Sequence, residues 1–229
     1  MVQVLAHRGV TAAARENTIA AFAAAAAARA DGVELDVRAT ADGALVVVHD
    51  AGIAGLGAVA ELDSGQLPRW IPTLAEALDA CAGLALVNVE IKSDGAPPDL
   101  AERVASALVA RAAGPELLVS SFDLSLLDAH RRFAPDIATG WLTLPGLPAP
   151  DLALAVETAA AGGHRAVNAH VWTITGELVG RAHRAGLHVG AWTVNDPERA
   201  IELARLGVDV LITDHPANLR VHLSGLSET

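Results

Sequence analysis

Two acidic residues, Glu34 and Asp36, are separated by one residue inside the apolar segment 32–37. A β-strand places residues i and i+2 on one face, so both carboxylates should point the same way while the apolar residues between them pack on the other side. Burial of two like charges side by side is costly unless a cation neutralises them. The same spacing returns at Glu90 and Lys92, where a carboxylate and an ammonium group share a strand face. The pattern predicts an ionic site on two strands.

Three carboxylates that converge would suit one hard divalent cation with oxygen ligands, Mg²⁺ or Ca²⁺. Arg8 and Lys92 flank these acidic residues and can bind the remaining charge of a phosphate group. His7 and His49 are the histidines near this set in the first part of the chain. Because two imidazoles on opposite sides of a phosphorus atom can act as general base and general acid, these residues favour metal-assisted phosphate-ester chemistry.

Strand-like and helix-like segments alternate along the 229 residues, as a single (β/α)₈ barrel requires. We expect strands at 2–6, 32–37, 84–91, 117–120, 137–142, 166–168, 187–192 and 208–212. We expect helices at 18–30, 74–81, 99–112, 124–133, 152–160, 176–185 and 197–206. A barrel gathers its site at the carboxyl ends of the strands. A doubly wound open sheet is the alternative, but no Gly-x-Gly-x-x-Gly follows the first strand.

Local signals support these boundaries. Asp196 and Pro197 suit the start of a helix, and Gly186 and Gly207 each follow a helix and precede a strand. Asp42-Gly43 predicts a turn before a probable extra strand at 45–48. The irregular segment 51–70 is rich in Gly and Ala, so we expect a short insertion over the barrel mouth within one domain, 1–229.

The composition excludes several classes of function. A formal net charge of −11 argues against a nucleic-acid partner and disfavours adhesion to anionic lipid. The single cysteine, Cys81, excludes an intrachain disulfide, and the absence of a Cys/His cluster disfavours structural zinc. No signal-peptide pattern and no long apolar stretch occur, so we expect a cytoplasmic protein without stable membrane insertion. The oligomeric state does not follow from the sequence.

Several short motifs occur in a specific order. They are Ala-His-Arg-Gly at 6–9, Glu-Asn-Thr at 16–18, Gly-Val-Glu-Leu-Asp-Val at 32–37, Thr-x-Asp-Gly at 40–43, His-Asp at 49–50, Val-Glu-Ile-Lys at 89–92, Ser-Ser-Phe at 120–122, Ala-Trp-Thr-Val-Asn at 191–195 and Gly-Val-Asp-Val-Leu-Ile-Thr-Asp at 207–214. Together they resemble the glycerophosphodiester phosphodiesterase family from His7 to Pro216. The chain departs from the family at Arg15, where proline is usual, and in the short segment after Asp50, which lacks the family's Arg-Thr stretch.

The resemblance implies a TIM barrel that hydrolyses small glycerophosphodiesters, such as glycerophosphocholine or glycerophosphoethanolamine, to glycerol 3-phosphate and an alcohol. It implies roles for eight residues: His7 and His49 in acid–base catalysis, Glu34, Asp36 and Glu90 as metal ligands, Arg8 and Lys92 as phosphate contacts, and Trp192 as an apolar wall. We also expect Phe122 to line the substrate site, and Glu16 and Asp50 to support their neighbours without touching substrate. Whether water or a glycerol hydroxyl of the substrate attacks stays open.

Two other functions compete with this one. A phospholipase D-like or lyase relative that acts on intact phospholipid would favour an exposed apolar or basic rim, which the acidic charge does not suggest. A non-catalytic binding barrel should have lost ligands or histidines, and here the full set is present.

Overall fold

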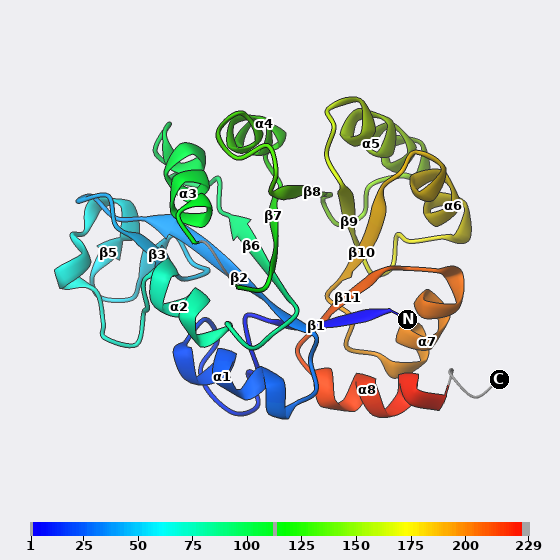
Figure 1. Cartoon of the computed structure of the whole chain (residues 1–229), viewed down its shortest axis with the longest axis horizontal. Coiled ribbons are helices and arrows are strands. Elements are labelled where there is room, and N and C mark those ends of the chain that lie inside the picture. Colours follow the sequence, from blue (N-terminus) through cyan, green and yellow to red (C-terminus); the bar gives the residue numbers. More distant parts are fainter. Residues whose placement is uncertain (1, 112–113, 226–229) are drawn as a thin grey trace.

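The computed structural model describes residues 2–111 and 114–225. Within these ranges a nine-stranded sheet closes on itself, because β1 pairs with both β11 and β2 (Figure 1). The parallel strands of this barrel are β1 (Gln3–His7), β2 (Gly32–Ala39), β6 (Leu86–Ile91), β7 (Glu116–Ser121), β8 (Ala138–Leu142), β9 (Ala166–His170), β10 (His188–Trp192) and β11 (Val210–Thr213). The ninth strand, β3 (Leu45–Val47), runs antiparallel beside β2. The predicted (β/α)₈ barrel is therefore confirmed, and the open sheet is wrong.

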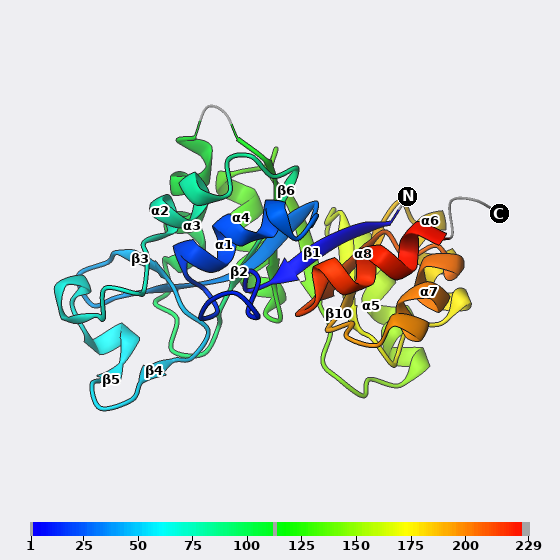
Figure 2. The same ribbon diagram turned by 90° about the horizontal axis from the view of Figure 1, so that it is seen from below.

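Helices cover the outside of the barrel all round its circumference (Figures 1 and 2). They are α1 (Ile19–Ala27), α2 (Leu74–Ala80), α3 (Leu100–Val109), α4 (Leu124–Phe133), α5 (Ala149–Ala161), α6 (Gly176–Arg184), α7 (Pro197–Leu206) and α8 (Pro216–Ser224). The predicted bounds of α4 and α7 are confirmed to the residue. Helix α8 was not predicted from the sequence, although Pro216 at its first turn is a start signal and Leu219 and Leu223 form its buried face.

The bounds of the other five predicted helices differ from the structure, and α2 and α6 each end one residue earlier than predicted. Helix α1 ends early because Arg29 adopts a left-handed conformation with φ of 57°. Helix α5 begins three residues early, since Pro150 lies in its first turn and does not delay its start. The predicted end of the third helix at residue 112 lies outside the described residues; the helix itself ends at Val109.

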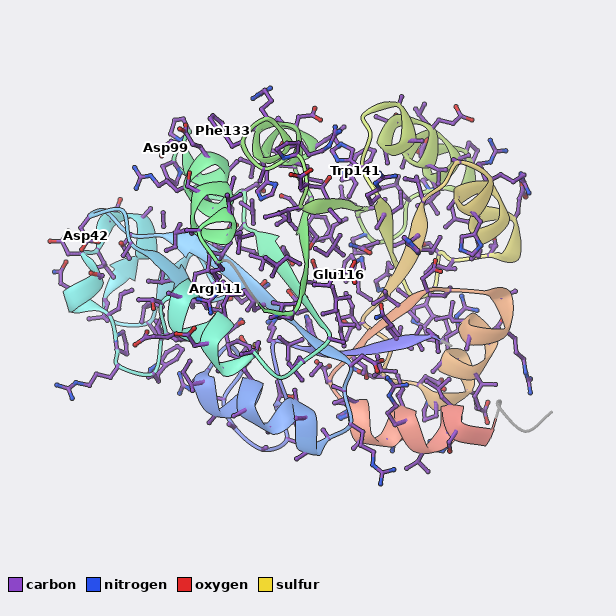
Figure 3. The ribbon with its side chains drawn as sticks, in the orientation of Figure 1. Asp42, Asp99, Arg111, Glu116, Phe133 and Trp141 are labelled. Carbon is purple, nitrogen blue, oxygen red and sulfur yellow. The ribbon has the colours of Figure 1, made fainter. Side chains whose placement is uncertain are left out.

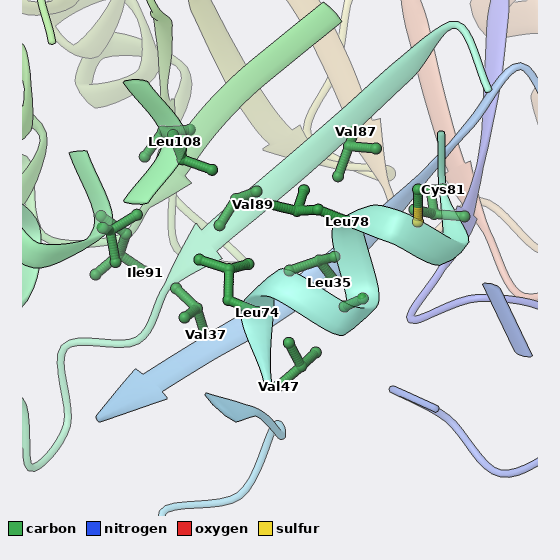
Figure 4. Close-up of a cluster of buried hydrophobic side chains, with 14 of the residues drawn as sticks. Leu35, Val37, Val47, Leu74, Leu78, Cys81, Val87, Val89, Ile91 and Leu108 are labelled. Carbon is green, nitrogen blue, oxygen red and sulfur yellow. The ribbon is translucent and has the colours of Figure 1, made fainter. Parts of the chain in front are cut away.

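The alternation along β2 separates packing from chemistry. Val33, Leu35 and Val37 pack outward in one apolar cluster, where Leu35 and Val37 lie against α2 (Figure 4). A second cluster lies under α5 to α8, and Trp141 of β8 packs against both clusters (Figure 3). Glu34 and Asp36 alternate with these apolar residues along the strand and therefore face the barrel interior. The sequence periodicity had predicted this division.

A short excursion follows β3 before α2 begins. It contains the small hairpin β4 (Gly52–Ile53) and β5 (Gly57–Ala58) and two single 3₁₀ turns, Val59–Glu61 and Ser64–Gln66. Asp42, in the turn between β2 and β3, lies at the outer edge of the molecule, away from the barrel centre (Figure 3). Among the helices of residues 2–111 and 114–225, none is long and apolar enough to cross a membrane.

Gly32 gives a test of how tightly the barrel is closed at β2. A Cβ atom at this position would collide with the carbonyl oxygen of Leu86, the paired residue on β6, and a backbone atom in a barrel cannot move aside easily. We expect Gly32→Ala to lower the free energy of unfolding by about 1–3 kcal/mol in urea titrations. Gly83→Ala, where a Cβ meets open space, is the matched control and should stay within about 0.5 kcal/mol of the parent. Equal stability of the two variants would contradict this close packing.

Candidate active site

Three carboxylates meet at the carboxyl ends of β2 and β6. The pairing of the two strands sets Asp36 beside Glu90, and Glu34 lies one pleat further back on the same face. Each of the three contributes an oxygen to a group whose atoms all lie within 4.8 Å of one another. All three residues are at most 9% exposed, so water screens their repulsion little. The structure therefore brings together the acidic residues that the sequence predicted would converge.

Two cationic side chains contact this cluster. Lys92 Nζ lies 2.7 Å from Glu90 Oε1 and 3.2 Å from Asp36 Oδ1. Arg8 Nε lies 3.3 Å from Asp36 Oδ2, while its Nη1 donates to Glu16 Oε2 at 3.1 Å. Two cations thus face three carboxylates, and Arg8 is shared with Glu16. One negative charge in the cluster is left without a balancing cation.

The backbone around Arg8 explains the His-Arg-Gly motif. Arg8 has a φ of 55° and directs its own N–H to Glu34 Oε2 at 3.1 Å. Gly9, with a φ of 83°, then lets the chain pass so close to Ala21 that a Cβ would collide with it. Asn17, also in the left-handed region, donates to Asp36 Oδ2 at 2.7 Å. The loop between β1 and α1 is therefore shaped to support the carboxylates.

The charges in the cluster shift one another's pKa in opposite directions. Burial raises the pKa of Glu34, and the neighbouring charge of Asp36 raises it further. Burial and Asp36 likewise raise the pKa of Glu90. For Asp36, burial acts upward, but Lys92 and Arg8 outweigh it, so its pKa is lowered. Without a metal ion, the surrounding side chains stabilise the charged form of Asp36 and destabilise the charged forms of Glu34 and Glu90.

These features fit a hard divalent cation. Glu34 Oε1 is buried and has no hydrogen-bond partner among the described residues, so an oxygen ligand is left free. Carboxylates are ligands that Mg²⁺ and Ca²⁺ prefer, and a positive ion here would reverse the penalty on ionised Glu34 and Glu90. The donor set contains no sulfur and thus matches the hard cation expected from the sequence.

Each candidate catalytic histidine has one ring nitrogen engaged by an aspartate. His7 Nδ1 lies 2.8 Å from Asp214 Oδ1, and its Nε2 lies 3.9 Å from Glu34 Oε2. His49 Nδ1 lies 2.8 Å from Asp50 Oδ1. Burial lowers the pKa of His7, but the hydrogen bond with Asp214 and the charge of Glu34 raise it by more. Both rings therefore keep Nε2 as the nitrogen that is free for chemistry.

Asp214 is a site residue whose role the sequence did not reveal. Its Oδ2 accepts a 2.6 Å hydrogen bond from Asn195 Nδ2, and its backbone N–H donates to Asn195 Oδ1 at 3.0 Å. The hydrogen bond with His7 lowers the pKa of Asp214, so its carboxylate stays ionised. By contrast, the side chain of Asp50 is 77% exposed and contacts only His49 among the described residues. The aspartate beside His7 is thus held more firmly than the one beside His49.

A cavity of about 190 Å³ opens beside the carboxylates. Its charged side is formed by His7, Arg8, Glu34, His49, Glu90 and Lys92. Its apolar side includes Phe122 and Trp192, whose rings pack edge to face with centroids 5.4 Å apart. Trp192 Nε1 donates to the carbonyl of Asn168 at 3.1 Å, which fixes the indole at the end of β10. The cavity has room for a small polar group on one side and an apolar wall on the other.

The remaining expected site residues fall into place around this cavity. Asp36 lies behind it, and Glu16 touches Arg8 as expected of a supporting residue. Asn88 on β6 and Ser120 on β7 line it as well, although the sequence analysis gave neither a role. Asn88 lies two residues before Glu90 and so shares its strand face, and Ser120 pairs with Glu90 across β6 and β7. The two-residue spacing of Asn88 was the signal that the sequence offered. His130 and His164 are buried but do not line this cavity, so they are packing residues.

Glu34 and Asp36 should respond oppositely to loss of charge in the presence of a chelator. A raised pKa means that ionised Glu34 destabilises the folded state near neutral pH, so Glu34→Gln should raise the free energy of unfolding while its amide oxygen still accepts from the Arg8 N–H. A lowered pKa means that ionised Asp36 stabilises it, so Asp36→Asn should lower that free energy by about 3 kcal/mol. Urea unfolding with EDTA measures both. Destabilisation by Glu34→Gln would show that Glu34 is satisfied without a metal.

Comparison with known proteins finds relatives that are phosphodiesterases. The family model described as the glycerophosphoryl diester phosphodiesterase family matches residues 7–218. A glycerophosphodiester phosphodiesterase of Caldanaerobacter subterraneus is 32% identical over 94% of this chain and 95% of its own. A crystal structure of the Thermotoga maritima glycerophosphodiester phosphodiesterase is 29% identical, with a TM-score of 0.82 over 96% of this chain and 98% of that one. An Oleispira antarctica phosphodiesterase in complex with the product sn-glycerol-3-phosphate is 27% identical, with a TM-score of 0.83 over 97% of this chain and 96% of that one. The chain belongs to the glycerophosphoryl diester phosphodiesterase family.

Proposed function

We propose that this phosphoric diester hydrolase cleaves small, water-soluble glycerophosphodiesters, such as glycerophosphocholine and glycerophosphoethanolamine, to glycerol 3-phosphate and an alcohol. The observation that carries the proposal is one cavity lined by two aspartate-bound histidines, two cationic side chains and Glu34 and Glu90 of the carboxylate cluster. The product named in the Oleispira antarctica complex supports the same substrate class. In this reading the whole chain, 1–229, acts as one domain, and the segment 51–70 borders the mouth of the site.

Glu34, Asp36 and Glu90 would hold one divalent cation, Mg²⁺ or Ca²⁺. When bound, such an ion neutralises charge on a phosphate oxygen. Arg8 and Lys92 would then bind the remaining phosphate charge, because both already lie beside the carboxylates that the ion would engage. Two cationic side chains beside a dianionic transition state strengthen binding there more than in the monoanionic diester.

His7 and His49 would move the protons. One Nε2 takes the proton of the attacking hydroxyl, and the other gives a proton to the oxygen of the leaving alcohol. His7 Nε2 lies 3.9 Å from Glu34, whereas His49 is held by Asp50 and lines the same cavity, so the two rings come from different strand ends. Trp192 and Phe122 would contact the carbon skeleton of the glycerol moiety and exclude water from that side.

Metal dependence is tested with purified protein that has been stripped with EDTA. We expect no hydrolysis of glycerophosphocholine in EDTA and restored turnover when Mg²⁺ or Ca²⁺ is added, because the ion supplies the charge that the cluster lacks. Release of glycerol 3-phosphate, followed in a coupled assay, is the measurement. Unchanged turnover in EDTA would contradict the proposed ion site. Turnover of intact phospholipid without turnover of the soluble diesters would favour the lipase-like alternative.

The histidine roles are tested by three substitutions. His7→Ala should lower kcat by about 10²–10⁴-fold with little change in thermal midpoint, because the loss is of a proton carrier. Asp214→Asn should lower kcat at least about tenfold with a small change in KM, since an amide no longer fixes the ring tautomer. Asp50→Asn is the matched comparison and should cost less, because Asp50 is exposed and held by no second partner among the described residues. Equal effects at both aspartates would contradict the difference in how they are held.

A further inference from the structure

A second cavity lies on the other side of His49. It measures about 490 Å³, against about 190 Å³ for the cavity beside the carboxylates. One wall comes from the loop before α1, with Arg15 and Glu16, and the other from the excursion after β3, with Ile53, Leu56 and Trp70. We call this cavity the outer groove. It is the larger of the two and is not used by the chemistry described above.

The outer groove adjoins the catalytic site at one shared residue. His49 lines both cavities, and Glu16, on the wall of the outer groove, holds Arg8 of the inner one at 3.1 Å. The inner cavity is smaller than the roughly 300–1,000 Å³ that enclose a drug-sized ligand. A phosphodiester carries two substituents on phosphorus, so when one fills the inner cavity the other must leave past a neighbouring side chain. His49 is such a side chain, because it separates the inner cavity from the outer groove.

The walls of the outer groove have the chemistry of a cation site. The guanidinium of Arg15 lies over the ring of Trp70, 4.1 Å from its centroid, which shows that this ring face accepts a positive group. Arg15 is exposed, and no hydrogen bond or ion pair of its side chain is present among the described residues. Asp50 and Glu16 add two carboxylates, while Leu56, 46% exposed, adds apolar surface. Glu16 is already paired with Arg8, so the exposed carboxylate of Asp50 is the negative group that the groove offers to a ligand. An aromatic ring, a carboxylate and apolar surface in one groove suit a positively charged ligand with apolar groups.

We propose that the outer groove binds the leaving alcohol of the substrate when that alcohol carries an ammonium group, as choline and ethanolamine do. The ammonium group takes the place of the Arg15 guanidinium on the ring of Trp70, and Asp50 faces its charge. Arg15 is thus an internal competitor of the substrate, and Trp70 is a specificity-determining residue. This inference rests on the proposed function, because it assumes that the phosphorus lies between the two histidines.

The test compares substitutions at two positions, Trp70 and Arg15, which should change KM of the metal-loaded enzyme in opposite directions. Trp70→Leu should raise KM for glycerophosphocholine at least about fivefold, and Trp70→Phe should raise it less, because an aromatic face remains. Arg15→Gln should lower KM for the same substrate, because the competing guanidinium is gone. For glycerophosphoglycerol, whose leaving alcohol is uncharged, Trp70→Leu and Arg15→Gln should each give a KM within twofold of the parent enzyme.

Trp172→Leu is the matched control for loss of an exposed tryptophan. Its ring is 65% exposed and also faces an arginine, Arg199, at 5.6 Å, but it lines neither cavity. This variant should leave KM for both substrates unchanged. A rise in KM for glycerophosphocholine in Arg15→Gln would overturn the proposal, because it would show that the guanidinium itself binds the head group. Equal effects of Trp70→Leu on both substrates would also overturn it.

Binding of choline alone separates this inference from the proposed function. Choline chloride, titrated into the protein and followed by NMR, should shift the Trp70 indole signal, which Trp70→Leu identifies, and should bind more tightly to Arg15→Gln. If no diester is hydrolysed but choline still shifts this signal, the proposed function fails and the cation site stands. If diesters are hydrolysed and choline shifts no signal of Trp70, the function stands and the cation site is overturned.

Discussion

The repulsion among three buried carboxylates is the constraint on which the rest of the site depends. Glu34, Asp36 and Glu90 share one face of two paired strands, where the barrel interior gives them little water. Arg8 and Lys92 compensate only part of this charge, and Asp36 is the carboxylate that both of them contact. An arrangement that stabilises the fold alone would have balanced or removed these charges. This imbalance suits a positive ion, which the proposed function places among the three carboxylates.

The loops around the barrel mouth have conformations that serve this cluster. Arg8 and Asn17 both adopt positive φ, which is uncommon outside glycine, and each uses that geometry to bring a donor to a carboxylate. Asn195 closes a pair of hydrogen bonds around Asp214 in a similar manner. These supporting groups restrict how far the charged side chains can turn. Catalysis by positioning and electrostatics depends on such restriction, because reorganisation during the reaction lowers its benefit.

Much of this arrangement could be predicted from the sequence, because it follows from periodicity. The two-residue repeat placed Glu34 and Asp36 on the inner face of a strand, and the alternation of strands and helices indicated a barrel. What could not be read is contact between distant segments. His7 and Asp214 are separated by 207 positions, so no local pattern indicated their hydrogen bond. Arg15 and Trp70 lie in irregular loops, where no period relates one position to another. Helix α8 was missed because its apolar face rests on few residues.

The closure of the barrel has a consequence for the order in which the protein becomes competent during synthesis. His7 belongs to the first strand, whereas the aspartate that orients its ring follows the last one. The three carboxylates all precede α3 in the chain, but the ring of His7 gains its partner only when β11 docks beside β1. A chain that ends before β11 therefore carries the three carboxylates but lacks the aspartate that fixes the ring of His7. The seam between the first and last strands thus completes the surroundings of His7 only when the polypeptide is nearly finished.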